Sequence, residues 1–113
     1  MAVSVPQIVY TNSWVGQTTA LSGVSLFTPT TTGLFRITVY IEQTTSPSGA
    51  VNGKFTWADS TGSQSSPMFN SGNANIYSST TIVAYATTST AISLTTTISG
   101  SPSYNLYVEI EAL

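Results

Sequence analysis

The sequence predicts an all-β protein, an antiparallel jelly-roll β-sandwich of about eight strands, and three observations support this prediction. Apolar and polar residues alternate in several segments, as expected for strands with one buried face. Residues that favour turns recur every 8–12 positions, a spacing typical of sandwiches and jelly rolls. No window has the i, i+3, i+4, i+7 apolar spacing of an amphipathic helix, and the abundant Val, Ile, Thr and Ser disfavour helix.

The clearest strand is residues 33–43, which follows a turn containing Pro29. Its inward-facing residues are predicted to be Phe35, Ile37, Val39 and Ile41. Eight strands are expected in all: residues 3–10, 20–28, 33–43, 52–59, 63–70, 76–86, 91–98 and 104–113. Pro6 lacks a backbone N–H, so the first of these strands is expected at a sheet edge. Between the first two, residues 11–19 are polar and are predicted to form a loop or an irregular edge.

Turns are expected at residues 44–49, 59–62, 71–75 and 99–102, where Gly, Pro, Asn, Asp and Ser gather. A chain of 113 residues is long enough for one modest core, so residues 1–113 are predicted to form a single domain. Only 5% of the residues are charged, whereas Thr and Ser together make up about a third of the chain. The surface is therefore expected to be solvated mainly by hydroxyl and amide groups.

Composition excludes several classes of function. Two basic residues supply too little positive charge for binding nucleic acid or an anionic membrane surface. No stretch approaches the eighteen apolar residues of a membrane-spanning helix. The N-terminus has neither the basic region nor the apolar region of a signal peptide, which predicts synthesis in a cytoplasm.

No catalytic, cofactor or metal site is expected, and the chain is predicted not to be an enzyme. It has no His and no Cys, which removes the imidazole bases, the thiolate ligands and the disulfides. Glu109 and Glu111 lie two residues apart on one strand face and are the best alternative, as a carboxylate pair for glycoside chemistry or calcium. Two solvated charges that discourage edge-to-edge pairing are the preferred explanation.

Aromatic residues suggest two kinds of binding surface. Trp14 stands alone in a polar segment and is the best single candidate for a platform that binds a sugar ring. Trp57 and Tyr104 are in phase with apolar neighbours and are expected in the core. Tyr40, Val83 and Tyr107 fall on the faces opposite the main apolar stripes of their strands, so an oligomer partner is expected to cover them.

Four segments carry a resemblance to a known family. Leu26-Phe27-Thr28-Pro29 followed by Gly33 to Ile41 resembles the early strands of the tumour-necrosis-factor and complement-globular-head jelly rolls, and residues 91–94 and 104–113 resemble their last strands. The composition is also similar to that of small β-domains of tailed-phage virions. No functional residue of the family is matched in this chain. The resemblance implies a homotrimer with a structural or attachment role on a particle.

These observations favour a non-enzymatic phage virion protein of the capsid-decoration or head-fibre type. Its expected partners are copies of itself and other virion proteins, with no cofactor, and its expected location is the virion. The alternative is a carbohydrate-binding or receptor-binding module at a fibre tip, whose ligand would be a host-surface glycan.

Overall fold

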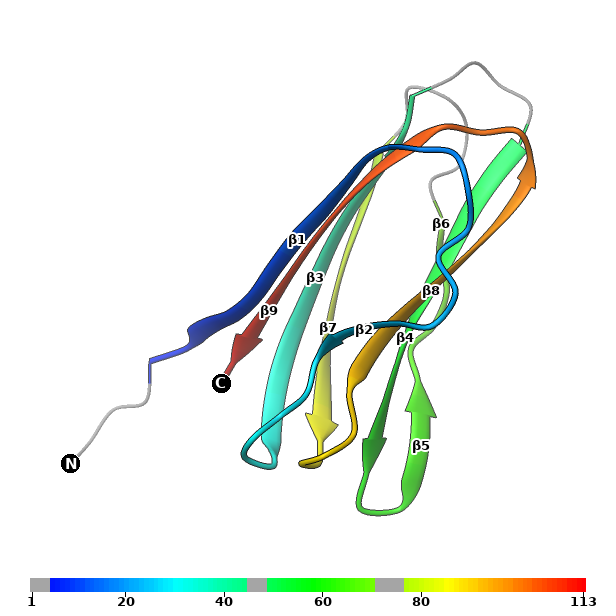
Figure 1. Ribbon diagram of the computed structural model, residues 1–113. Helices are drawn as coiled ribbons and strands as arrows, with labels where there is room; N and C mark the ends of the chain where they lie inside the picture. The colour runs from blue at the N-terminus through cyan, green and yellow to red at the C-terminus, as the bar shows by residue number, and fades with distance from the viewer. Residues whose placement is uncertain (1–4, 45–48, 71–76) are drawn as a thin grey trace.

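The computed structural model describes residues 5–44, 49–70 and 77–113, and these residues form nine strands arranged in two layers (Figure 1). The strands are β1 (Gln7–Gln17), β2 (Val24–Phe27), β3 (Gly33–Gln43), β4 (Gly49–Asp59), β5 (Gly62–Ser65), β6 (Phe69–Asn70), β7 (Tyr77–Ala86), β8 (Ile92–Gly100) and β9 (Tyr104–Ala112). No helix in these residues is long and apolar enough to cross a membrane.

The two sheets have the strand orders β1-β9-β3-β7 and β2-β8-β4-β5, and every pairing is antiparallel. β6 also pairs with β4, on the side away from β8. The chain crosses between the sheets at nearly every connection. First and last strands pair, as do second and second-to-last, and the nesting continues inward to the β4–β5 hairpin. This is the jelly-roll order, so the predicted fold class is confirmed.

The core lies between the two sheets and is built from the inward-facing residues of each strand. In β3, residues 35, 37, 39 and 41 are buried, as their alternation predicted. Tyr104 is fully buried, and Trp57 is half buried against the core, which agrees with their predicted core positions. β3 has a paired strand on both sides, β9 and β7, and is therefore central in its sheet.

For residues 11–19 a loop or an irregular edge was predicted, and the second alternative is confirmed for residues 11–17, which continue β1 along the edge of its sheet. Register shifts between Ile8 and Tyr10, and again between Trp14 and Gln17, change which residues face inward. These irregularities break the period-two pattern that marks a strand in a sequence. The predicted edge position of the first strand is confirmed.

The predicted strand 63–70 is divided into β5 and β6, because residues 66–68, which include Pro67, form no strand. The turn at residues 59–62 is confirmed: the Asp59 carboxylate accepts hydrogen bonds from the backbone N–H and the hydroxyl of Thr61, at 2.8 and 2.7 Å. Three predicted features lie wholly or partly outside the described residues. They are the loop at 71–75, the middle of the turn at 44–49, and Ile76, the first residue of the predicted strand 76–86.

Candidate functional site

The outer faces of the two sheets differ strongly in character. Exposed large apolar side chains occur on all four strands of the β1-β9-β3-β7 sheet: Ile8, Val15, Leu34, Tyr40, Tyr77, Val83, Tyr85 and Tyr107. On the strands of the other sheet, none of the described residues is an exposed large apolar residue. The outer face of β4 and β8 instead carries residues such as Thr56, Ser93 and Thr95. An exposed apolar surface confined to one face indicates an interaction site.

Three tyrosines gather on this face where β7 begins, one each from β9, β3 and β7, and we call them the tyrosine cluster. Tyr40 lies directly opposite Tyr107 on β9, and the centres of their rings are 6.0 Å apart. Tyr77 on β7 stacks on the other side of Tyr40, with a ring distance of 5.3 Å and an interplanar angle of 12°. Burial, followed by the nearby Glu42 and the two other tyrosines, raises the pKa of Tyr40.

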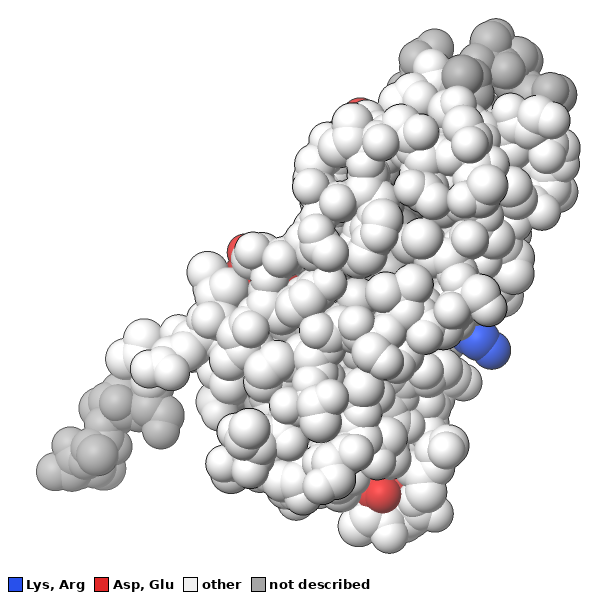
Figure 2. Space-filling view, viewed as in Figure 1, with Lys and Arg blue, Asp and Glu red and all other residues white. Residues whose placement is uncertain are grey.

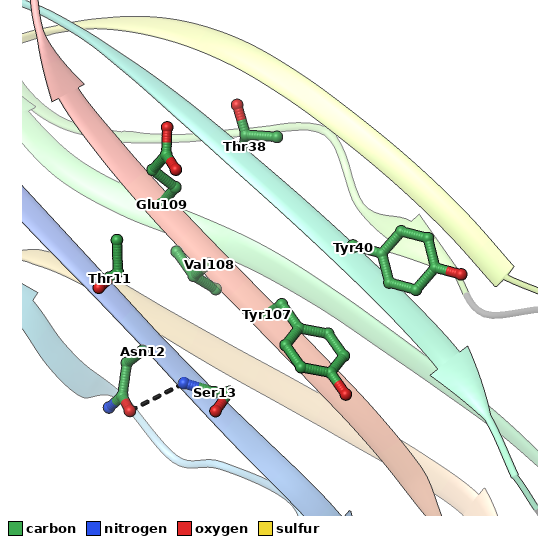
Figure 3. A pocket seen from close by; sticks show the side chains of 8 residues that line it. All are labelled: Thr11, Asn12, Ser13, Thr38, Tyr40, Tyr107, Val108 and Glu109. Atoms are coloured by element: carbon green, nitrogen blue, oxygen red, sulfur yellow. Dashed lines mark hydrogen bonds between the residues drawn. The ribbon is translucent and has the colours of Figure 1, made fainter. Parts of the chain in front are cut away.

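A shallow groove of about 580 Å³ runs beside the cluster, over β1, β9 and β3. Figure 3 shows the rings of Tyr40 and Tyr107 beside each other at one end, and Glu109 beside Thr38 at the other. Thr11 and Ser13 line the groove from the edge strand β1. The groove therefore offers two aromatic rings, several hydroxyl groups and one carboxylate, a combination suited to binding rather than to catalysis.

Charged groups are sparse on the molecule, as Figure 2 shows for the side that it presents. On the outer face of the tyrosine-bearing sheet, Arg36 forms an ion pair with Glu111 at 3.5 Å, and Glu42 accepts a hydrogen bond of 3.0 Å from Asn105. Glu111 is thus engaged by Arg36, and it does not line the groove that Glu109 lines. The two carboxylates therefore do not face a common cleft, as glycoside chemistry would require. Within the described ranges, no three acidic side chains come together as metal ligands would.

The structure brings two of the three predicted interface residues together. Tyr40 and Tyr107 are neighbours, whereas Val83 lies opposite Arg36, which is four residues from Tyr40 along β3. Val83 is exposed on the same face and belongs to a second apolar area with Leu34 and Tyr85, which are also directly opposite each other. Whether these residues contact a partner stays a prediction.

Trp14 lies elsewhere than its sequence context suggested. It is half buried on the edge strand β1, packs against the core and lies opposite Leu106, so its ring is not isolated among the polar residues around it in the sequence. A role for Trp14 in ligand binding stays a prediction. The sequence does not reveal Thr11 and Ser13 as groove residues, because the register shifts of β1 obscure its alternation. It does not reveal that Tyr77 stacks on Tyr40, because this contact depends on the pairing of β3 with β7.

Comparisons with known proteins identify no family for the chain. No protein-family model matches it, and a search of curated proteins finds no match. Among solved structures, the chain is similar to the one described as "Bacillus endospore appendages form a novel family of disulfide-linked pili", with 12% identity and a TM-score of 0.49, over 96% of this chain and 86% of that one. This chain has no cysteine, so it has no means of forming such a linkage. The fold assignment rests on the strand order alone, and the resemblance to the tumour-necrosis-factor family stays a prediction.

Proposed function

We propose that this chain is a non-enzymatic structural protein that works as a symmetric homo-oligomer, with the outer face of the β1-β9-β3-β7 sheet as its contact surface. In the more specific form of the proposal, it is a homotrimer on a phage virion, of the capsid-decoration or head-fibre type. Other virion proteins are its further partners.

The observation that carries the proposal is the difference between the two outer faces. One bears the tyrosine cluster together with Leu34, Val83 and Tyr85, and the other bears hydroxyl groups. Aromatic residues are enriched and charged residues depleted at the centres of protein interfaces. The tyrosine cluster extends over three of the four strands of this sheet, β9, β3 and β7, and so supplies a continuous aromatic area for such a contact.

Symmetric assembly explains how a small and nearly uncharged chain would occupy a particle surface firmly. Each copy would make only a weak contact with the particle, since few ions are available for a strong electrostatic attraction. Copies held together bind as one multivalent unit, and the effective concentration of the second and third contacts makes the whole attachment tight.

A second candidate function, binding of a neutral glycan, is favoured by the groove itself. Sugar rings present C–H faces that stack on aromatic rings, and the Tyr40 and Tyr107 rings stand beside hydroxyls and the Glu109 carboxylate. This site would replace Trp14 as the ligand platform. It competes with the oligomer for the same tyrosines, so one experiment separates the two functions.

The experiment compares the solution mass of the wild-type protein with that of the double variant Tyr40→Ser/Tyr107→Ser, by light scattering over a range of micromolar concentrations. Loss of the two rings is expected to weaken association at least tenfold, because aromatic residues at an interface centre contribute about 2 kcal/mol or more. The control is Thr97→Ala, an exposed position on β8 in the opposite sheet, which should leave the mass unchanged. A monomeric wild-type protein whose tyrosine fluorescence responds to soluble cell-surface polysaccharide would support glycan binding instead.

A further inference from the structure

A second apolar feature lies at the end of the sandwich where β1 begins and β9 ends. It is a pocket of about 320 Å³, which we call the corner pocket, lined by Val9, Phe27, Thr31, Gly33, Leu34 and Leu113 among others. Val9 and Phe27 also pack against the core, so the pocket opens toward the hydrophobic interior. No charged side chain lines it.

Near the pocket, the N-terminal part of the described chain carries two apolar side chains that are largely exposed to solvent. Val5 is 72% exposed and Ile8 is 62% exposed. Gln7 pairs with Ala112, and the two described residues before it form no strand and lead away from the two sheets (Figure 1). We call residues 5–8 the arm; Pro6 holds φ near −65° in it and so favours an extended chain. Gln7 and Ile8 are the first residues of β1, opposite Ala112 and Glu111, and Gln7 also lines the pocket, so the arm is anchored beside the pocket of its own chain.

We propose that the arm of one copy inserts its apolar side chains into the corner pocket of the next copy. This inference rests on the proposed self-assembly and names residues that would hold the copies together. Neither the arm nor the side chains that line the pocket carry a charge. Insertion of the arm would bury apolar surface of both, which a single molecule leaves exposed to water. A contact between two different patches is heterologous, and such a contact gives a cyclic trimer when successive copies are rotated by a third of a turn.

The location of the pocket agrees with the proposed contact surface. Leu34 lines the pocket and lies directly opposite Tyr85, and Val83 is two residues further along β7. The pocket rim therefore continues onto the outer face of the β1-β9-β3-β7 sheet. An arm seated in the pocket would extend the same interface around the corner of the molecule.

The first test is the variant Val5→Asp/Ile8→Asp, measured by light scattering. Both positions are exposed, so the single chain should fold as before. A carboxylate that enters an apolar pocket loses its hydration, so association is expected to weaken at least tenfold. The matched control is Met68→Asp, since Met68 is 58% exposed, lies between β5 and β6 rather than on the proposed contact surface, and does not line the pocket. An arm variant that associates as strongly as the control would overturn the inference.

The second test fills the pocket from inside, with Gly33→Leu. A Cβ atom at Gly33 would meet no other atom within 4 Å, so the new side chain has room. If the arm uses this space, Gly33→Leu competes with it and weakens association severalfold or more. If the pocket is only a void, the variant melts at a higher temperature with its mass unchanged, and the inference is overturned.

A disulfide test identifies which pocket receives the arm, and the chain has no native cysteine to interfere. Val5→Cys protein mixed with Thr31→Cys protein should give a cross-linked pair of chains under mild oxidation. Cross-linking confined to a single chain in the double variant would mean that each arm occupies its own pocket, contrary to the inference. A monomeric wild-type protein would overturn both the proposed self-assembly and the arm insertion. An oligomer whose mass is unchanged by all the arm and pocket variants would overturn only the arm insertion.

Discussion

At the scale of the residue, the buried hydroxyl of Tyr104 connects β9 to the segment that leads into β2. It donates a hydrogen bond of 2.7 Å to the Thr19 carbonyl oxygen and lies 3.1 Å from the Thr96 hydroxyl. The Thr96 hydroxyl in turn accepts a hydrogen bond of 2.7 Å from the Leu21 N–H. The segment of residues 19–21, which belongs to no strand, is thereby held against the sandwich.

The variant Tyr104→Phe should lower the free energy of unfolding by about 1–2 kcal/mol, because it removes the hydroxyl and leaves the buried Thr96 hydroxyl short of a partner. Urea denaturation measures the change. Tyr85→Phe is the control, since Tyr85 is exposed and its hydroxyl is free to bond with water. Equal stability of the two variants would contradict the bracing role of Tyr104.

The same residue predicts a dependence of stability on alkaline pH. Burial raises the pKa of Tyr104 above the value of about 10 that an unfolded tyrosine has. The folded state therefore holds this proton more tightly, and the stabilisation is complete below about pH 10 and is lost as pH rises above it. The free energy of unfolding of the wild-type protein should therefore fall more steeply between about pH 9 and pH 11 than that of Tyr104→Phe, which has no hydroxyl to ionise at this position.

At the scale of the element, the two-residue strand β6 depends on a glycine in β4. Phe69 lies opposite Gly53 and is almost fully buried, and its ring centre is 5.6 Å from that of Phe55. A Cβ atom at residue 53 would overlap the ring of Phe69. The missing side chain of Gly53 is therefore what lets the ring lie against β4.

The variant Gly53→Ala should accordingly destabilise the protein by about 1–3 kcal/mol, the usual cost of overpacking a core, and should displace Phe69. Thermal unfolding measures the first effect. Gly33→Ala provides the comparison, because the added methyl group there meets nothing. Should both variants unfold at the same temperature, Gly53 would have no such role.

Elements differ in how well the sequence predicted them, and the cause is the regularity of their pairing. β3 and β7 pair over ten residues without a register shift, so their alternating patterns are unbroken and both strands were predicted closely. β1 has two register shifts, which place Trp14 against the core and hide the strand from a period-two pattern. β6 is two residues long, which is too short for any periodicity to mark.

At the scale of the whole molecule, the jelly-roll order brings β9, the last strand, between β1 and β3, and so places Tyr107 beside Tyr40. Alternation within each strand was enough to predict that both residues face away from the core. It could not predict that they are neighbours, that Tyr77 stacks beside them, or that the opposite outer face lacks exposed large apolar residues within the described strands. Those facts depend on pairings between residues distant in sequence.

The central claim, that copies of this chain associate through the tyrosine-bearing face, is tested most directly by the solution mass of the wild-type protein. Light scattering at low micromolar concentration should give three times the chain mass of 11.9 kDa. A mass of 11.9 kDa at every concentration would contradict the claim. It would also leave the tyrosine cluster and its groove to the glycan-binding alternative.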